Sequence, residues 1–133
     1  MQRRHTRQKQ IIQKIIEGPG KHMTAEEVKA ALDEEGIPAG LATVYRNLNL
    51  LCEEGIIQKI SEHGISFYDG DPEPHDHLYC LQCGSIFDIG GPYMQEADRA
   101  AEKMMGAKII RHSTAFEGIC SECLKKEEKR QWN

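Results

Sequence analysis

Apolar residues recur at helical spacing in the first third of the chain and predict two amphipathic helices. Four isoleucines between residues 11 and 16 repeat every three or four positions, which favours a helix over about residues 6–17. The second helix has a clear start, because Thr24 and Glu27 form a capping box, and Gly36 provides its stop. Each helix therefore presents one apolar face for burial.

A third apolar stripe predicts a helix over about residues 41–54, and two short β runs at residues 57–60 and 65–68 follow it as a hairpin. The opposite face of this helix is mostly polar and carries Ala42, Thr43, Arg46, Asn49 and Glu53, with Tyr45 on the flank. Three helices followed by a hairpin is the order of a winged helix-turn-helix domain, whose last helix enters the DNA major groove. Thr43 and Arg46 carry groups suited to base edges or phosphates. A generic small α+β domain with a solvated polar face would show the same pattern.

Two prolines and a glycine in residues 69–74 block helix and strand continuation and indicate a domain boundary. We expect a winged-helix domain over residues 1–69, a linker over residues 70–74 and a second domain over residues 75–133. In the second domain we expect strands at residues 78–81, 85–89 and 107–116 and a helix at residues 92–105. The helix should turn Met94, Ala97, Ala101 and Met104 inward and end at Gly106. The predicted fold class is α+β.

Two CxxC pairs dominate the chemistry of the second half: Cys80 with Cys83, and Cys120 with Cys123. Together they can supply four thiolates to one tetrahedral zinc ion, and the long spacer between them predicts a small subdomain. We expect a protein without a signal peptide in a reducing compartment, which disfavours disulfides. Redox cysteines are the other interpretation, since CxxC is also a redox spacing.

A second set of metal-binding side chains surrounds His75 and His77. Residues two apart on a strand point to the same face, so these imidazoles should converge. His22, Asp69 and Asp88 could complete the set. Imidazole and carboxylate together suit Fe(II), Mn(II) or Zn(II). A simple surface histidine pair is the alternative.

The distribution of charge along the chain says more about a possible nucleic-acid contact than the net charge does. The net charge of −4 gives no nucleic-acid signal for the whole chain. Residues 1–16, however, contain five basic residues and no acid: Arg3, Arg4, Arg7, Lys9 and Lys14. This basic arm suggests a local anionic contact, and a solvated terminus is the alternative. No apolar run approaches the ~18 residues of a membrane span, so we expect a cytoplasmic protein without a membrane partner.

In combination these motifs resemble the ferric uptake regulator (Fur) family of metal-dependent transcriptional repressors. The matching stretches are residues 22–28, 41–48, 54–57, 75–84 and 118–120, together with Cys123. The resemblance implies a winged-helix domain, an α/β dimerisation domain, a homodimer, a double-stranded DNA operator and structural zinc on the four cysteines. It also implies a regulator rather than an enzyme, with no small-molecule substrate.

Carried over residue by residue, the resemblance implies a regulatory Fe(II) or Mn(II) site. Its ligands would be His22, Asp69, His75, His77 and Asp88, and the DNA contacts would come from Arg3, Arg4, Arg7, Thr43, Tyr45 and Arg46. Three histidines with two aspartates resemble the peroxide-responsive branch, whereas iron-responsive members usually carry glutamates at the positions of Asp69 and Asp88. We therefore predict a peroxide sensor, with an iron-responsive repressor as the alternative. In such sensors peroxide oxidises a ligand histidine, which implies His22 or His77 here.

Some family members have a third metal site, which would draw here on Asp76, Glu96 and His112. Pro74 stands where a histidine is often found, which argues against this site. Cys52 matches no ligand position and is expected in the core. Two functions of other classes remain open: a non-haem iron enzyme built on two histidines and a carboxylate, and a zinc-ribbon interaction module without a regulatory metal.

Overall fold

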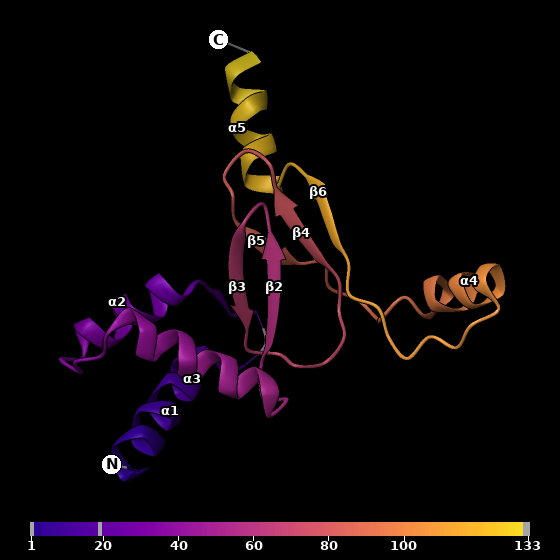
Figure 1. Cartoon of the computed structure of the whole chain (residues 1–133). Coiled ribbons are helices and arrows are strands. Elements are labelled where there is room, and N and C mark those ends of the chain that lie inside the picture. Colours follow the sequence, from indigo (N-terminus) through magenta and orange to yellow (C-terminus); the bar gives the residue numbers. More distant parts are fainter. Residues whose placement is uncertain (1, 19, 132–133) are drawn as a thin grey trace. The chain divides into compact units, whose positions relative to one another are not determined.

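The computed structural model describes the backbone of residues 2–18 and 20–131 and the side chains of residues 7–18 and 20–128. The chain divides into two compact units, Met1–Pro72 and Glu73–Asn133. Most of the helices and strands of both units are labelled in Figure 1. Among the described residues, no helix combines the length and apolar character needed to cross a membrane.

The first unit packs three helices with a three-stranded antiparallel sheet of order β1-β3-β2. Its elements are α1 (Gln2–Ile16), β1 (His22–Met23), α2 (Ala25–Glu34), α3 (Leu41–Glu53), β2 (Gln58–Glu62) and β3 (Ile65–Asp69). Its core consists of fully buried apolar side chains: Ile12, Ile16, Val28, Leu32, Val44, Leu48, Leu51, Ile57 and Tyr68. The half-buried Cys52 packs against this core, as expected.

Local signals set the element ends in this unit. The predicted capping box is present: the Thr24 hydroxyl accepts from the Glu27 N–H, and the Glu27 carboxylate accepts from the Thr24 N–H, both at 3.2 Å. The hairpin turn consists of His63 (φ 52°) and Gly64 (φ 78°). Positive φ at both central residues fits the right-handed twist of the flanking strands. The strand β1 was not predicted, because two residues are too short for a periodic signal.

The second unit contains a three-stranded sheet of order β5-β4-β6 and two helices. Its elements are β4 (His77–Cys80), β5 (Ile86–Asp88), α4 (Gln95–Met105), β6 (Ala115–Gly118) and α5 (Ser121–Gln131). β4 pairs antiparallel with β5 and parallel with β6. The predicted strands beside the first CxxC pair are therefore confirmed to within one or two residues.

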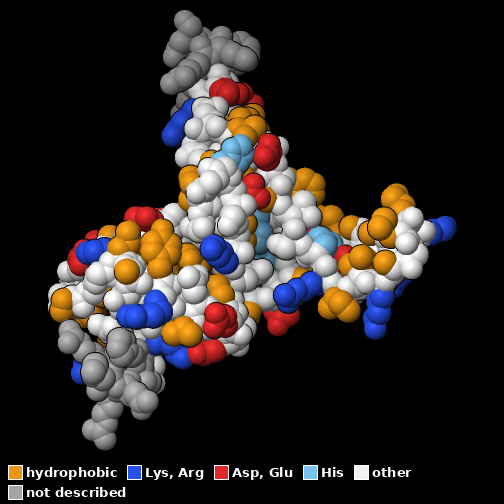
Figure 2. Space-filling model, in the orientation of Figure 1, with side chains coloured by type: hydrophobic (Ala, Val, Ile, Leu, Met, Phe, Trp, Pro, Cys, Tyr) orange, Lys and Arg blue, Asp and Glu red, His pale blue; other side chains and the backbone are white. Residues whose placement is uncertain are grey.

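Two predictions for the second unit are wrong. The helix α4 begins at Gln95 rather than Pro92, and it buries none of its described side chains. Met104 is 84% exposed and Met94 38% exposed, so these two side chains do not enter a core as predicted. Figure 2 shows hydrophobic side chains gathered over this helix.

The second wrong prediction is the long strand at residues 107–116, of which only Ala115 and Phe116 are in β6. β4 reaches only the end of this segment, where the His77 N–H donates to the Thr114 carbonyl at 2.9 Å, and side chains bind the part before it. Glu102 Oε2 accepts from the Ile109 N–H at 3.0 Å, and the Tyr93 hydroxyl accepts from the His112 N–H at 2.7 Å. Gly106 ends α4 in the left-handed conformation (φ 65°), as predicted.

Candidate metal centres and recognition helix

The four CxxC cysteines meet at one end of the second unit's sheet. Cys80 ends β4, Cys83 lies in the following turn, and Cys120 and Cys123 flank the start of α5. The Sγ atoms of Cys80 and Cys123 are 3.8 Å apart, and those of Cys83 and Cys120 are 3.9 Å apart. Four sulfurs at ~2.3 Å from one tetrahedral ion lie ~3.8 Å from one another. The cluster therefore has the geometry of a structural zinc site, and its cysteines are free thiols rather than disulfides.

The sheet explains why the two distant pairs converge. The parallel pairing of β4 with β6 places Cys80 opposite Gly118, two residues before Cys120. Cys80 Sγ accepts from the backbone N–H groups of Cys83 and Cys120, each at 3.4 Å. These donors lower the pKa of Cys80 to about 6, whereas the Cys120 side chain and burial raise the pKa of Cys123 to about 12. Metal binding at this cluster must therefore release protons.

In the first unit, His22 and Asp69 form a buried imidazole–carboxylate pair. The register of β1 and β3 places them opposite each other, and His22 Nε2 lies 3.2 Å from Asp69 Oδ2. Their side chains are 6% and 0% exposed. The other carboxylate oxygen, Asp69 Oδ1, accepts from the Asp71 N–H at 2.9 Å, which fixes the orientation of the carboxylate. The pair offers one nitrogen and one oxygen donor.

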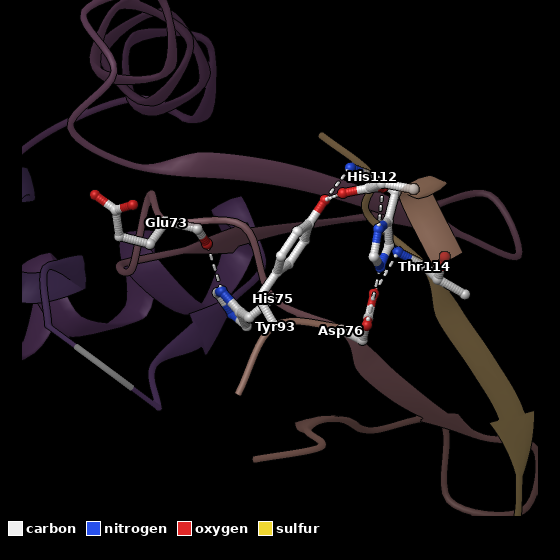
Figure 3. A network of polar contacts seen from close by, with 7 residues as sticks. Glu73, His75, Asp76, Tyr93, His112 and Thr114 are labelled. Carbon is white, nitrogen blue, oxygen red and sulfur yellow. Dashed lines mark hydrogen bonds and ion pairs between the residues drawn. The ribbon is translucent and has the colours of Figure 1, made fainter. Parts of the chain in front are cut away.

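In the second unit, Asp88 faces both histidines of the predicted pair. Asp88 Oδ1 lies 2.9 Å from His75 Nε2 and 3.4 Å from His77 Nε2, and the two ring centroids are 4.3 Å apart. The register of β4 and β5 places His77 opposite Asp88. His75 Nδ1 lies 2.6 Å from the Glu73 carbonyl oxygen (Figure 3), to which it must donate a proton.

That hydrogen bond determines which nitrogen of His75 is left without a proton to face Asp88. A neutral His75 with its proton on Nδ1 turns an Nε2 lone pair toward the negatively charged Asp88 Oδ1. Such an arrangement is stable only with a cation, either a proton or a metal ion, between the two atoms. Each unit therefore offers imidazole nitrogen and carboxylate oxygen donors, which suit Fe(II), Mn(II) or Zn(II).

A third polar cluster surrounds His112 (Figure 3). His112 Nδ1 lies 2.7 Å from Asp98 Oδ1 and Nε2 lies 3.2 Å from Asp76 Oδ2. The Tyr93 hydroxyl donates to Asp98 Oδ2, and the Tyr93 ring stacks on the imidazole at 4.5 Å between centroids. Hydrogen bonds that the imidazole donates to Asp98 and Asp76 raise the pKa of His112, and hydrogen bonds from the Tyr93 hydroxyl and His112 lower the pKa of Asp98.

The carboxylate of α4 at this cluster is Asp98, a residue that the sequence analysis missed. Glu96, the residue expected there, is exposed and makes no described contact with His112. Which carboxylate of α4 meets His112 depends on the irregular path of residues 107–114, which no local pattern encodes. Tyr93 was missed for the same reason.

The candidate DNA-contacting residues lie on α1 and α3. On α3, Arg46 is exposed, Thr43 is half-buried, and the Tyr45 hydroxyl donates to Glu26 Oε1 at 3.2 Å. Partial burial and the Glu26 carboxylate raise the pKa of Tyr45, so its hydroxyl stays a proton donor. Arg7 is exposed on α1, whereas Lys9 is committed to an ion pair with Glu54. The side chains of Arg3 and Arg4 lie outside the described residues.

Comparison with known proteins identifies the family. The family model described as "Ferric uptake regulator family" matches residues 1–117. The chain belongs to the ferric uptake regulator family. It is therefore an α+β metal-responsive transcriptional regulator, and the sequence resemblance is confirmed.

Relatives of both predicted branches match this Fur-family chain. It is 36% identical over 118 residues to the ferric uptake regulation protein of Bacillus subtilis, covering 85% of this chain and 79% of that protein. It is 32% identical over 121 residues to the peroxide-responsive repressor PerR of Staphylococcus aureus, covering 90% and 82%. A solved structure of the Helicobacter pylori ferric uptake regulator, described as having three functional metal-binding sites, superposes with a TM-score of 0.74. That match has 27% identity and covers 88% of this chain and 82% of the other.

Proposed function

We propose that this Fur-family chain is a cytoplasmic, homodimeric DNA-binding repressor that senses peroxide through a regulatory Fe(II) or Mn(II) ion. The observation that carries the proposal is the position of Asp88 Oδ1 between His75 Nε2 and His77 Nε2, which offers one ion two nitrogen donors and one oxygen donor. The buried pair of His22 and Asp69 offers the remaining donors from the first unit. The four-cysteine cluster would hold a structural zinc ion, separate from the sensing chemistry.

The division of the proposed ligands between the two units gives a physical basis for regulation. His22 and Asp69 belong to the unit that carries α3, and the other three belong to the unit with the zinc cluster. An ion bound by all five would select one relative orientation of the units, and thus one spacing of the two recognition helices in a dimer. An operator with fixed half-site spacing fits only that state. The ion shifts the population because it binds one arrangement more tightly than the others.

The homodimer is supported by the exposed apolar side chains of the second unit. Met104, Met105 and Ile110 are 84%, 76% and 82% exposed. Soluble monomers rarely expose large contiguous apolar patches, and such patches mark interaction sites. A second copy of the same unit would cover this surface in an isologous contact.

The peroxide branch is supported by Asp69 and Asp88 standing where iron-responsive members usually carry glutamates. Bound Fe(II) would pass an electron to hydrogen peroxide and regain it from the ring, so that the two electrons that reduce the peroxide come overall from the imidazole. One peroxide oxygen would then be added to the imidazole of His22 or His77, and the other would leave as water. The oxidised ring would no longer present its nitrogen as a ligand, so the repressor would leave its operator.

Mass spectrometry after peroxide treatment tests this chemistry. The Fe(II)-loaded protein should gain the mass of one oxygen on a peptide containing His22 or His77, and the Mn(II)-loaded protein should not. His63→Asn provides a control, because it removes an exposed histidine and retains a side chain suited to positive φ. Unmodified histidines together with unchanged DNA binding would refute peroxide sensing and favour the iron-responsive alternative.

A further inference from the structure

Two side-chain hydrogen bonds join α3 to β3, which carries Asp69, and to α2, which follows the strand that carries His22. The buried Tyr68 hydroxyl donates to Asn49 Oδ1 at 3.1 Å, and the Tyr45 hydroxyl donates to Glu26 Oε1 at 3.2 Å. Tyr45 and Asn49 are four residues apart and therefore lie on one side of α3. All four residues belong to the first unit.

The far ends of these hydrogen bonds lie close to the proposed ligands along the chain. Tyr68 directly precedes Asp69 in β3 and is paired in register with Met23, the neighbour of His22. Glu26 lies in the first turn of α2, which begins just after β1. Thus β3 reaches α3 through Tyr68, and the segment that carries His22 reaches it through Glu26.

The Tyr68 bond defines one position of β3 against α3. The Tyr68 side chain is fully buried, so loss of its partner would leave a buried hydroxyl without a hydrogen bond, which is unfavourable. The apolar contacts in the rest of the core are not directional, whereas this hydrogen bond is. A shift of β3 along α3 would therefore break a specific interaction.

The same bond orients Asn49 on the surface of α3. Asn49 is exposed on the helix face that also carries Arg46. With its Oδ1 bound by Tyr68, its NH₂ group is the part left to face solvent, and an amide N–H is a suitable donor for a phosphate or a base edge.

We propose that Tyr68 is a positioning residue that couples the His22–Asp69 pair to DNA binding by orienting Asn49, with Glu26 holding Tyr45 in a parallel contact. The inference rests on the proposed metal-dependent DNA binding. It adds a route by which the ion would set the DNA-facing side chains within the first unit, in addition to the orientation of the two units.

The test measures how far Mn(II) strengthens DNA binding in matched variants. A DNA duplex is first selected from a random pool with the Mn(II)-loaded wild-type dimer. The Kd for that duplex is then measured by fluorescence anisotropy with and without Mn(II), for wild type, Tyr68→Phe, Asn49→Ala and the double variant. Tyr79→Phe is the control, because it removes the hydroxyl of a largely buried tyrosine in the other unit.

The ratio of metal-free to Mn(II)-bound Kd should fall about 3- to 30-fold in Tyr68→Phe and in Asn49→Ala, a range typical of residues that modulate coupling between sites. The double variant should lose no more than the larger single effect, because both changes remove one interaction. By linkage, DNA should strengthen Mn(II) binding less in these variants, by the same factor. Tyr79→Phe should retain the wild-type ratio.

The possible outcomes separate the inference from the function on which it rests. Tyr68→Phe could weaken DNA binding equally with and without Mn(II), leaving the ratio of the two Kd values unchanged. This result would show a merely structural role and overturn the inference alone. If Tyr68→Phe does not fold, an unchanged ratio in Asn49→Ala, whose mutated side chain is on the surface, overturns it equally. A wild-type protein that shows no dependence on Mn(II) would overturn both proposals.

Discussion

Asp88 is the side chain on which the proposed regulatory site depends most directly. One of its oxygens lies 2.9 Å from His75 Nε2 and 3.4 Å from His77 Nε2. The Glu73 carbonyl accepts the proton of His75 Nδ1, so the Nε2 lone pair is directed at a carboxylate. Asp88 therefore brings a carboxylate oxygen to both imidazoles, an arrangement that either a proton or a metal ion would stabilise.

Replacing Asp88 with Asn should weaken Mn(II) binding strongly, because the amide carries no charge to balance the ion. Loss of a group behind a metal ligand typically costs 10–100-fold in affinity, so loss of a ligand should cost at least about 100-fold. Isothermal titration calorimetry of the zinc-loaded protein would measure the Mn(II) affinity. Asp33→Asn is the matched control, because Asp33 forms a surface ion pair with Lys29. Equal Mn(II) affinities for both variants would contradict the assignment.

The His112 cluster gives a pH-dependent prediction. Its contacts with Asp98 and Asp76 raise the His112 pKa above the ordinary 6.5, so the folded state favours the imidazolium. The resulting stabilisation is fully present below pH 6.5 and is lost as the pH rises through the raised pKa. A histidine NMR titration should show the raised pKa in the wild type and a lower one in Asp98→Asn. A His112 pKa unaffected by this substitution would contradict the assigned contact.

The end of β3 closes tightly on the end of α1 in the first unit. Gly70 donates its N–H to the Lys21 carbonyl at 3.1 Å and accepts from the Gly18 N–H at 3.2 Å. A Cβ atom at Gly70 would lie 1.9 Å from the Ile16 carbonyl oxygen. Only glycine allows the strand that carries Asp69 to leave the sheet here.

Gly70→Ala should lower the free energy of unfolding of the first unit by at least about 2 kcal/mol, because backbone atoms must move to accept the methyl group. Gly40→Ala is the control, since no atom lies within 4 Å of its Cβ position and its φ is −73°. It should cost less than about 1 kcal/mol, the scale of a helix-cap change. Urea denaturation followed by circular dichroism would compare them. Equal losses would refute the close contact at Gly70.

At the scale of helices, strands and turns, the sequence predicted correctly those elements whose ends depend on local signals. The capping box at Thr24, the His63–Gly64 turn and the Gly106 helix end are all present because each depends only on neighbouring residues. Local signals could not predict the irregular segment at residues 107–114, because side chains distant in the sequence form hydrogen bonds with it. The apolar stripe of α4 was correctly read as amphipathic but wrongly placed in the core of its own chain.

For the whole molecule, the sequence predicted which side chains gather into candidate metal sites. It did not predict which other side chains form hydrogen bonds with them. The CxxC spacing and the HxH motif pointed to two groups of metal-binding side chains. The contacts of Asp98, Tyr93, Tyr68 and Glu26 depend on long-range packing, so neither spacing nor periodicity could reveal them. The resemblance to the Fur family was confirmed, while the choice between iron and peroxide sensing rests on Asp69 and Asp88.

The zinc cluster should determine the stability of the second unit. The three strands and the exposed α4 of the second unit bury little apolar surface. A structural zinc ion, by contrast, contributes on the order of 10 kcal/mol to folding. Cys123→Ser should therefore lose bound zinc, measured by elemental analysis, and the second unit should unfold. Cys52→Ser, which changes a half-buried cysteine of the first unit, should retain one zinc per chain. Full zinc content in Cys123→Ser would contradict the site.

The central claim is tested most directly by DNA binding of the zinc-loaded dimer on its selected operator, titrated without oxygen with Mn(II) or Fe(II) and repeated after hydrogen peroxide. The account predicts that both ions support binding and that peroxide abolishes binding only by the Fe(II) form. Survival of both forms after peroxide would contradict peroxide sensing and indicate an iron- or manganese-responsive repressor. Binding that needs no added metal would contradict the regulatory site itself.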